Sequence, residues 1–134
     1  MEKRELTDKD RALIEEARRT GDRLYLRDIQ EVAAALRTKS GQVFSGIHIE
    51  ANVGFADICG EVAAICTMVS NGHRDLDTIV AGACDGQGHI RLMSPCGRCR
   101  EVISDLNPEA WVIVGTTEAP YKVRISELLP LKSE

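Results

Sequence analysis

Apolar residues recur at helical spacing in three parts of the chain. Thr7 precedes the first part as an N-cap, and the periodicity after it predicts a helix that ends near Gly21. The second part covers residues 59–71, where a final Asn-Gly pair is typical of a helix end. The third begins where Pro95 can start a helix and ends before Pro108. We expect the second helix to bury a stripe formed by Val62, Ile65, Cys66 and Val69.

Short apolar runs between these helices predict strands. By periodicity alone, residues 32–36 are consistent with either a buried strand or a helix segment. A turn at 39–42 and the alternation along 43–49 favour a hairpin. Residues 78–84 and 111–115 have the unbroken apolar character of buried strands, so we expect Cys84 in the core. Strands that alternate with helices indicate a layered α/β domain with a mixed sheet.

Length and charge limit the class of protein. A chain of 134 residues is expected to fold as one domain over residues 1–134. Its 17 basic and 21 acidic residues give a formal net charge of −4, without the basic face that binding to nucleic acid phosphates requires. We therefore expect a small-molecule substrate and no nucleic acid polymer as a partner.

The N-terminus is highly charged and lacks the apolar segment of a secretory signal. No run approaches the roughly 18 apolar residues that span a bilayer. These features predict a cytoplasmic protein without a membrane partner. Five cysteines in such a chain are expected to be reduced thiols, and their odd number prevents complete intramolecular disulfide pairing. Metal binding or catalysis explains them better.

Three cysteines stand at predicted helix starts. Cys96 and Cys99 lie three residues apart on the first turn of a helix, so both sulfurs can face one ion. The positive end of the helix dipole favours their thiolate forms. Cys59 can supply a third sulfur, and three protein ligands leave the fourth position of a tetrahedral Zn²⁺ open for water. Cys66 lies about 10 Å further along the helix, too far to join them, and is expected in the core.

Glu61 follows Cys59 by two residues. Its carboxylate can therefore lie beside the metal without binding it and accept a proton from bound water. Zinc deaminases combine such a glutamate with three Cys or His/Cys/Cys ligands and a Pro-Cys-x-x-Cys segment, which here begins at Pro95. The alternatives are buried apolar cysteines or a purely structural zinc, with Glu61 as a solvated helix carboxylate.

With these motifs, the sequence resembles the cytidine deaminase family, including its blasticidin-S deaminase branch. The resemblance covers nearly the whole chain and rests on the glycine turn at Gly41 and on segments 33–36, 46–50, 59–61, 94–100, 102–106 and 127–130. It implies a three-layer α/β/α sandwich with a mixed central sheet. It also implies a small zinc hydrolase of nucleoside metabolism and pyrimidine salvage that is often a homotetramer.

The resemblance also implies roles for individual residues. The backbone of Gly60 would contact the carbonyl of the base, and the carbonyl of Ser94 would accept a hydrogen bond from the departing amine. Glu50 matches the glutamate that binds the ribose. The implied proton shuttle is Glu61, and the implied zinc ligands are Cys59, Cys96 and Cys99.

Three positions depart from the family pattern. His48 stands where an asparagine of the family usually binds the sugar 3′-hydroxyl. Gln30 falls near the position at which the family carries an aromatic residue that stacks on the pyrimidine. Val62 replaces an arginine that offsets thiolate charge in many tetrameric members. Arg98, inside the Cys-x-x-Cys pair, resembles the blasticidin branch and can take over that role. A plain surface position is the alternative for His48, Glu50 and Arg98.

We therefore expect hydrolytic deamination of cytidine, deoxycytidine or a modified cytosine nucleoside. One alternative is deamination of a cytosine-containing antibiotic of the blasticidin type. Another is a zinc-stabilised binding module without turnover, which ammonia release would distinguish from an enzyme although zinc content would not. The acidic balance and small size disfavour a polynucleotide deaminase.

Overall fold

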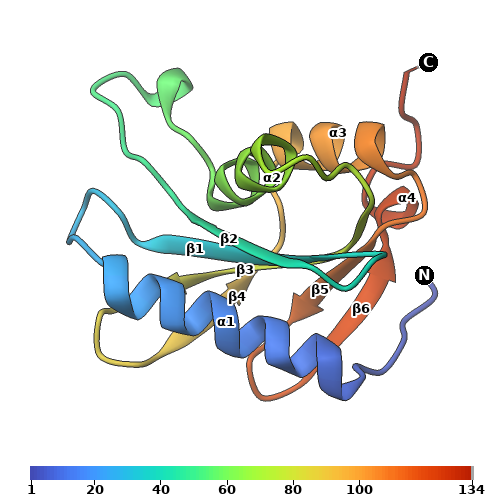
Figure 1. Ribbon diagram of the computed structural model, residues 1–134, viewed down its shortest axis with the longest axis horizontal. Coiled ribbons are helices and arrows are strands. Elements are labelled where there is room, and N and C mark those ends of the chain that lie inside the picture. Colours follow the sequence, from blue (N-terminus) through green and yellow to red (C-terminus); the bar gives the residue numbers. More distant parts are fainter. Residues whose placement is uncertain (134) are drawn as a thin grey trace.

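The computed structural model describes residues 1–133 and consists of a mixed sheet between two layers of helices (Figure 1). Strands β3 and β5 are parallel, and the other strand pairs are antiparallel. The strands are β1 (Val32–Thr38), β2 (Val43–Ile47), β3 (Leu76–Cys84), β4 (Ile90–Met93), β5 (Trp111–Gly115) and β6 (Pro120–Arg124). Their order is β2-β1-β3-β5-β6, and β4 pairs with β3.

The helices lie on both faces of the sheet. Figure 1 shows α1 (Asp8–Leu24) on one face, with α2 (Gly60–Ser70), α3 (Gly97–Leu106) and α4 (Ile125–Leu128) on the other. A short 3-10 turn, η1 (Gly54–Ala56), precedes α2. The expected three-layer α/β/α sandwich with a mixed central sheet is therefore confirmed. Among the described residues, no helix combines the length and apolar character that crossing a bilayer requires.

Helix α1 starts as predicted but ends later. The Thr7 hydroxyl accepts a hydrogen bond from the Asp10 backbone N–H, and the Asp10 carboxylate accepts one from the Thr7 N–H, which completes a capping box. The predicted end near Gly21 is wrong, because the helix continues to Leu24. A Cβ at Gly21 would lie 2.0 Å from the sulfur of Cys84. This glycine therefore allows α1 to approach the sheet and does not stop the helix.

The structure resolves the ambiguous apolar run and adds two strands. Residues 32–36 form part of strand β1, and the predicted hairpin is present as β1 and β2. Strands β4 and β6 were not predicted. Strand β4 has only four residues, and β6 carries Lys122 and Arg124, so neither contains a long apolar run. The ladder with β5 and an ion pair from Lys122 to Asp10 hold β6 in the sheet.

The predicted buried stripe of α2 is wrong in part. Cys66 is exposed and Val69 is 38% exposed, whereas the helix buries Ala64, Ile65 and Met68. A Cβ at Gly46 on β2 would lie 2.3 Å from the backbone nitrogen of Ala64. The close approach of β2 to α2 therefore centres the buried face on Ala64 and turns Cys66 outward. Cys84 is buried, as predicted.

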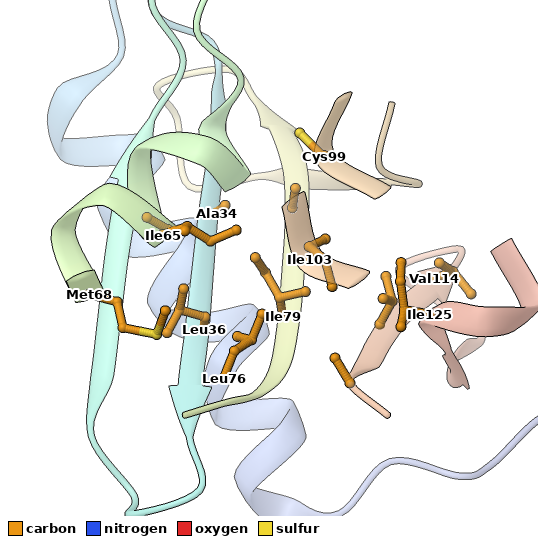
Figure 2. Close-up of a cluster of buried hydrophobic side chains, with 14 of the residues drawn as sticks. Ala34, Leu36, Ile65, Met68, Leu76, Ile79, Cys99, Ile103, Val114 and Ile125 are labelled. Carbon is orange, nitrogen blue, oxygen red and sulfur yellow. The ribbon is translucent and has the colours of Figure 1, made fainter. Parts of the chain in front are cut away.

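Apolar side chains fill both spaces between the layers. The larger cluster lies between the sheet and the helices α2, α3 and α4. Figure 2 shows Cys99 at one end of this cluster, beyond Ile103. A smaller cluster packs under α1 and includes Leu13, Ala17 and Ile113. The larger cluster thus fixes the positions of α2 and α3, which carry the predicted metal ligands.

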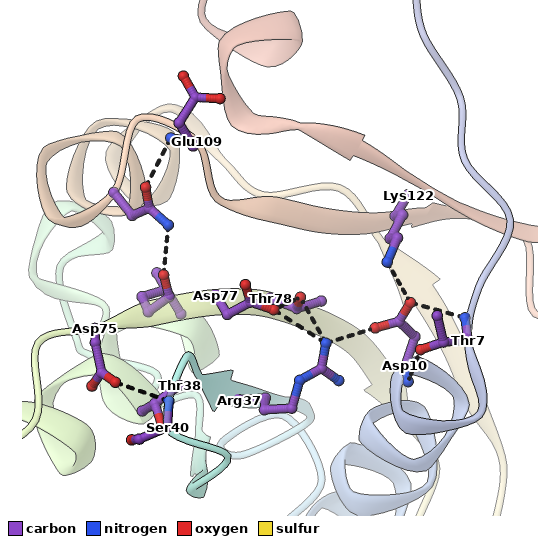
Figure 3. A network of polar contacts seen from close by, with 12 residues as sticks. Thr7, Asp10, Arg37, Thr38, Ser40, Asp75, Asp77, Thr78, Glu109 and Lys122 are labelled. Atoms are coloured by element: carbon purple, nitrogen blue, oxygen red, sulfur yellow. Dashed lines mark hydrogen bonds and ion pairs between the residues drawn. The ribbon is translucent and has the colours of Figure 1, made fainter.

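A polar network ties the start of α1 to the sheet. The fully buried Asp10 carboxylate accepts hydrogen bonds from Lys122 at 2.8 Å and from Arg37 at 3.0 Å (Figure 3). Arg37 also donates to Asp77 and Thr78. Burial alone would raise the pKa of Asp10, but these donors and the Thr7 N–H hold it below its ordinary value.

One edge of β3 has two successive partners. Thr78 and Ile79 pair with β5, whereas residues 81–84 pair with β4. The chain leaves β4 at Met93, opposite Ala81, and enters α3 after Cys96 rather than at Pro95. The β4–α3 connection therefore begins beside the middle of the sheet and leads to the start of α3.

Candidate active site

Two helix starts bring together the three cysteines predicted to bind zinc. Cys59 is the N-cap of α2, and Cys96 is the N-cap of α3. The Cys96 sulfur lies 3.3 Å from that of Cys59 and 3.5 Å from that of Cys99. All three sulfurs lie within 4.8 Å of one another. A tetrahedral Zn²⁺ with bonds of about 2.3 Å places its sulfur ligands about 3.8 Å apart, close to the observed spacing.

The thiols have contrasting environments. Burial raises the pKa of Cys59, and the neighbouring Cys96 thiol raises it further. Burial also raises the pKa of Cys99, with the Glu61 carboxylate as the next cause. At Cys96, burial opposes ionisation, but hydrogen bonds from the backbone N–H groups of Cys99 and Arg98, together with the other two thiols, lower the pKa. Crowded thiols of this kind ionise together when a divalent cation neutralises their charge, so the donor set fits zinc.

Glu61 lies in the first turn of α2, beside this cluster. Only 6% of the residue is exposed, and burial raises the pKa of its carboxyl group. A hydrogen bond with Cys99 acts in the opposite direction on that pKa. The carboxyl group is therefore held next to the three sulfurs, in a position suited to proton transfer.

A cavity of about 140 Å³ opens in front of Cys59, Cys96 and Glu61. Dry cavities of about 150 Å³ hold one benzene ring, so the volume suits a single six-membered ring. The walls are mainly apolar, and the cavity is lined by Val32, His48, Cys59, Gly60, Glu61, Ala81, Met93, Ser94 and Cys96.

Four lining residues that were predicted to bind the substrate or the metal lie at or near the starts of α2 and α3. Gly60 belongs to the α2 start, and a Cβ there would lie 2.9 Å from the carbonyl oxygen of Val32. The missing side chain thus lets the helix start approach β1. Ser94 and Cys96 lie on the β4–α3 connection, opposite α2. Cys59 completes this group at the N-cap of α2.

A polar pair lies at the side of the cavity. The His48 side chain lines the cavity and is 17% exposed, and its Nε2 lies 3.0 Å from a carboxylate oxygen of Glu50. Glu50 is 47% exposed and is not one of the lining residues. Asp57 is close enough for its carboxylate to lie within 4.8 Å of both groups, and it accepts a hydrogen bond from the Ala51 N–H at 2.7 Å.

Three other predicted positions lie outside the cavity lining. Gln30 donates its amide hydrogen bond to the carbonyl of Leu24. Val62 packs against the larger apolar cluster. Arg98 directs its guanidinium to the backbone carbonyls of Asp57 and Phe55, and only its backbone N–H faces Cys96.

The model of the cytidine and deoxycytidylate deaminase zinc-binding region matches residues 7–115 of this chain. The chain belongs to the cytidine deaminase family. It is therefore a deaminase, which is a class of hydrolase.

Individual relatives of this deaminase support the same assignment. Blasticidin-S deaminase from Bacillus cereus is 41% identical over 131 residues, covering 95% of this chain and 94% of that protein. Cytidine deaminase from Halalkalibacterium halodurans is 36% identical over 103 residues, covering 75% and 74%. The crystal structure of cytidine deaminase from Burkholderia pseudomallei has a TM-score of 0.78 and 27% identity, covering 96% of this chain and all of that one.

Three residues that line the cavity of this deaminase were not predicted from the sequence. Val32, Ala81 and Met93 come from three different strands and form its apolar walls. Their identity as apolar strand residues carries no chemical signal. The only hint in the sequence was the position of Met93 immediately before the Ser-Pro-Cys segment.

Proposed function

We propose that this chain is a zinc-dependent hydrolase that removes the exocyclic amine of a cytosine-type nucleoside. The observation that carries the proposal is the burial of the Glu61 carboxyl group beside the cluster of three cysteine sulfurs, at a cavity that Glu61, Cys59 and Cys96 line. The zinc ligands would be Cys59, Cys96 and Cys99. The volume of about 140 Å³ supports a substrate with a single ring at the reacting end.

The residues of the cavity can perform the proton transfers that this hydrolysis needs. Zinc, when bound, would activate a water molecule for attack on the ring. Glu61 would take a proton from that water and deliver it to the ring nitrogen N3, which makes C4 more electrophilic. A second proton passed by Glu61 to the amine lets the C4–N bond break and ammonia leave. Water supplies both protons and the new carbonyl oxygen.

The other cavity residues would orient the base and the sugar. The backbone of Gly60 would bind the carbonyl of the base, and the carbonyl of Ser94 would accept a hydrogen bond from the departing amine. The His48–Glu50 pair would face the sugar. The position of His48 supports this orientation, because the residue lines the cavity and its backbone N–H donates to the carbonyl oxygen of Val32 at 2.8 Å.

A specific observation favours a second substrate. The 41% identity to blasticidin-S deaminase extends over 95% of the chain, whereas the match to the cytidine deaminase from Halalkalibacterium halodurans covers 75%. The alternative proposal is therefore deamination of blasticidin S, a reaction that uses the same groups on the same cytosine ring.

A substrate panel tests both proposals. Zinc-loaded protein is incubated with cytidine, deoxycytidine, 5-substituted and N4-substituted cytidines, cytosine and blasticidin S, and both ultraviolet loss and ammonia are measured. We expect ammonia from at least one cytosine nucleoside or from blasticidin S, and the ratio of kcat/KM values decides between them. Binding without ammonia release from any of these compounds would instead support a zinc-stabilised binding module.

We also propose that the chain assembles into a homotetramer, as the family resemblance implies. Exposed apolar side chains on α2 and on the loop before it support self-association: Val53, Phe55 and Val69. Light scattering of the purified protein should give the mass of four chains. The mass of a single chain would contradict the proposal.

A further inference from the structure

The segment between His48 and Cys59 forms a loop whose two ends are joined. Ile49 and Ile58 exchange both of their backbone hydrogen bonds, at 2.9 and 3.0 Å. Beyond this pair, the loop reaches out to η1, where Phe55 is 83% exposed. Figure 1 shows this segment extending away from the sheet before it enters α2. Apolar packing therefore contributes little to holding the outer half of the loop.

Arg98 on α3 contacts this outer half. Its Nη1 donates to the carbonyl oxygen of Asp57 at 2.6 Å, and its Nη2 donates to that of Phe55 at 2.9 Å. A guanidinium group presents these donors in a rigid fork, which suits two carbonyl oxygens at fixed positions. The first turn of α3, which carries Cys96 and Cys99, is thereby linked to a segment that lies about 40 residues earlier in the chain.

A second contact extends the link to Glu50. The Asp57 carboxylate accepts a hydrogen bond from the Ala51 N–H at 2.7 Å, across the inside of the loop. On the other side, the Glu50 N–H donates to the carbonyl of Ile29. Glu50 therefore lies between a bond to the turn before β1 and a bond to the segment that Arg98 holds.

We propose that Arg98 is a positioning residue, which fixes the loop of residues 49–58 and through it the His48–Glu50 pair beside the cavity. The inference rests on the proposed function, in which this pair faces the sugar of the substrate. It differs from the role implied by the family resemblance, in which Arg98 offsets thiolate charge. The guanidinium donates both of its hydrogen bonds to the loop, and this geometry supports the new role.

The two roles predict different results for Arg98→Ala. A positioning residue leaves the zinc content unchanged. It raises KM for the nucleoside by about tenfold while kcat changes less than about threefold, because the lost bonds held the binding groups and not the reacting ones. The Ala51 amide should also exchange with solvent faster, since its bond to Asp57 depends on the held loop. Arg98→Lys can reach one carbonyl and should restore part of the KM.

Matched variants separate positioning from general damage. Arg124→Ala removes another arginine that donates to a backbone carbonyl, that of Glu109, and should change neither KM nor loop exchange. Asp57→Ala removes the second contact of the link, whereas Asp57→Asn retains an acceptor oxygen. Asp57→Ala should therefore raise KM as Arg98→Ala does. The double variant should raise KM by less than the product of the two single increases, because both residues belong to one link.

The proposal needs both the rise in KM and the faster exchange of the Ala51 amide. Loss of zinc from Arg98→Ala with unchanged loop exchange would overturn it in favour of the thiolate role. Unchanged KM or unchanged exchange in a zinc-loaded Arg98→Ala protein would also overturn it. If the unsubstituted protein released no ammonia from any substrate, the proposed function would fail. The exchange measurement would then show separately whether Arg98 holds the loop.

Discussion

The sulfur of Cys96 lies 3.3 Å from the sulfur of Cys59, although 37 residues separate them in the sequence. Both residues are N-caps, so each sulfur stands at the start of a helix rather than along its side. The packing of α2 and α3 on the same face of the sheet brings these two starts together. This short distance brings two local motifs together in one candidate metal centre.

Replacing Cys96 should remove the metal. We expect the unsubstituted protein to bind about one zinc per chain and Cys96→Ser to lose most of it, because a hydroxyl is a far poorer zinc ligand than a thiolate. Metal analysis after dialysis measures the loss. Cys66→Ser is the matched control, since Cys66 is exposed on α2 outside the cluster and its replacement should leave the zinc in place. Full zinc retention by Cys96→Ser would contradict the assigned ligand set.

Replacing Glu61 should separate catalysis from stability. Glu61→Gln preserves the shape of a buried side chain but cannot take up a proton, so kcat should fall by about 10²- to 10⁴-fold. The zinc content should not change, and Tm should stay the same or rise, because a neutral amide costs less to bury than a carboxylate. Exposed Glu101 on α3 provides a control, Glu101→Gln, with unchanged kcat. Turnover by a folded, zinc-loaded Glu61→Gln protein at the normal rate would rule out the proton-transfer role.

His48 should influence which sugar is accepted. An imidazole is bulkier than the asparagine usual at this position and, when neutral, offers one donor and one acceptor in a different geometry. We expect weaker substrate selectivity than a typical cytidine deaminase shows, with tolerance for substituted cytosines or an altered sugar. His48→Asn should shift the ratio of kcat/KM values toward plain cytidine over blasticidin S. Exposed His89 lies outside the cavity lining, so His89→Asn should leave that ratio unchanged. If the protein strictly preferred cytidine and neither substitution changed that preference, His48 would have no role in the sugar pocket.

Asp10 should contribute stability that depends on pH. Asp10→Asn leaves Lys122 and Arg37 without their buried partner and should lower the free energy of unfolding by about 3–5 kcal/mol near pH 7. The folded pKa of Asp10 lies below its unfolded value of about 3.9, so its contribution is complete above that value and declines as the pH falls through the folded pKa. Urea denaturation should therefore show that the difference in the free energy of unfolding between the two proteins becomes smaller below about pH 3.9. Asp8→Asn, at an exposed position in the same helical turn, should cost less than about 1 kcal/mol. An equal gap at pH 3 and pH 7 would contradict the linkage.

Features that depend on neighbours along the chain could be predicted from the sequence. The N-cap at Thr7, the helix starts at Cys59 and near Cys96, and the hairpin after β1 arise from contacts a few residues apart, so their signals are local. The same holds for the candidate ligands, because Cys96 and Cys99 share one helical turn. The spacing of Glu61 from Cys59 predicted a carboxyl group beside the candidate metal centre by the same short-range geometry.

Only the tertiary structure decided how distant segments fit together. The close approach of Gly46 to Ala64 brings one face of α2 against the sheet, and Cys66 lies outside that face although its spacing predicted the core. The apolar walls from Val32, Ala81 and Met93 exist because three strands meet in the sheet. The direction of the Arg98 side chain likewise depends on a loop about 40 residues away. Helical period and caps are set by bonds within one turn of chain, whereas burial, cavity walls and long side-chain contacts depend on which surfaces pack against each other.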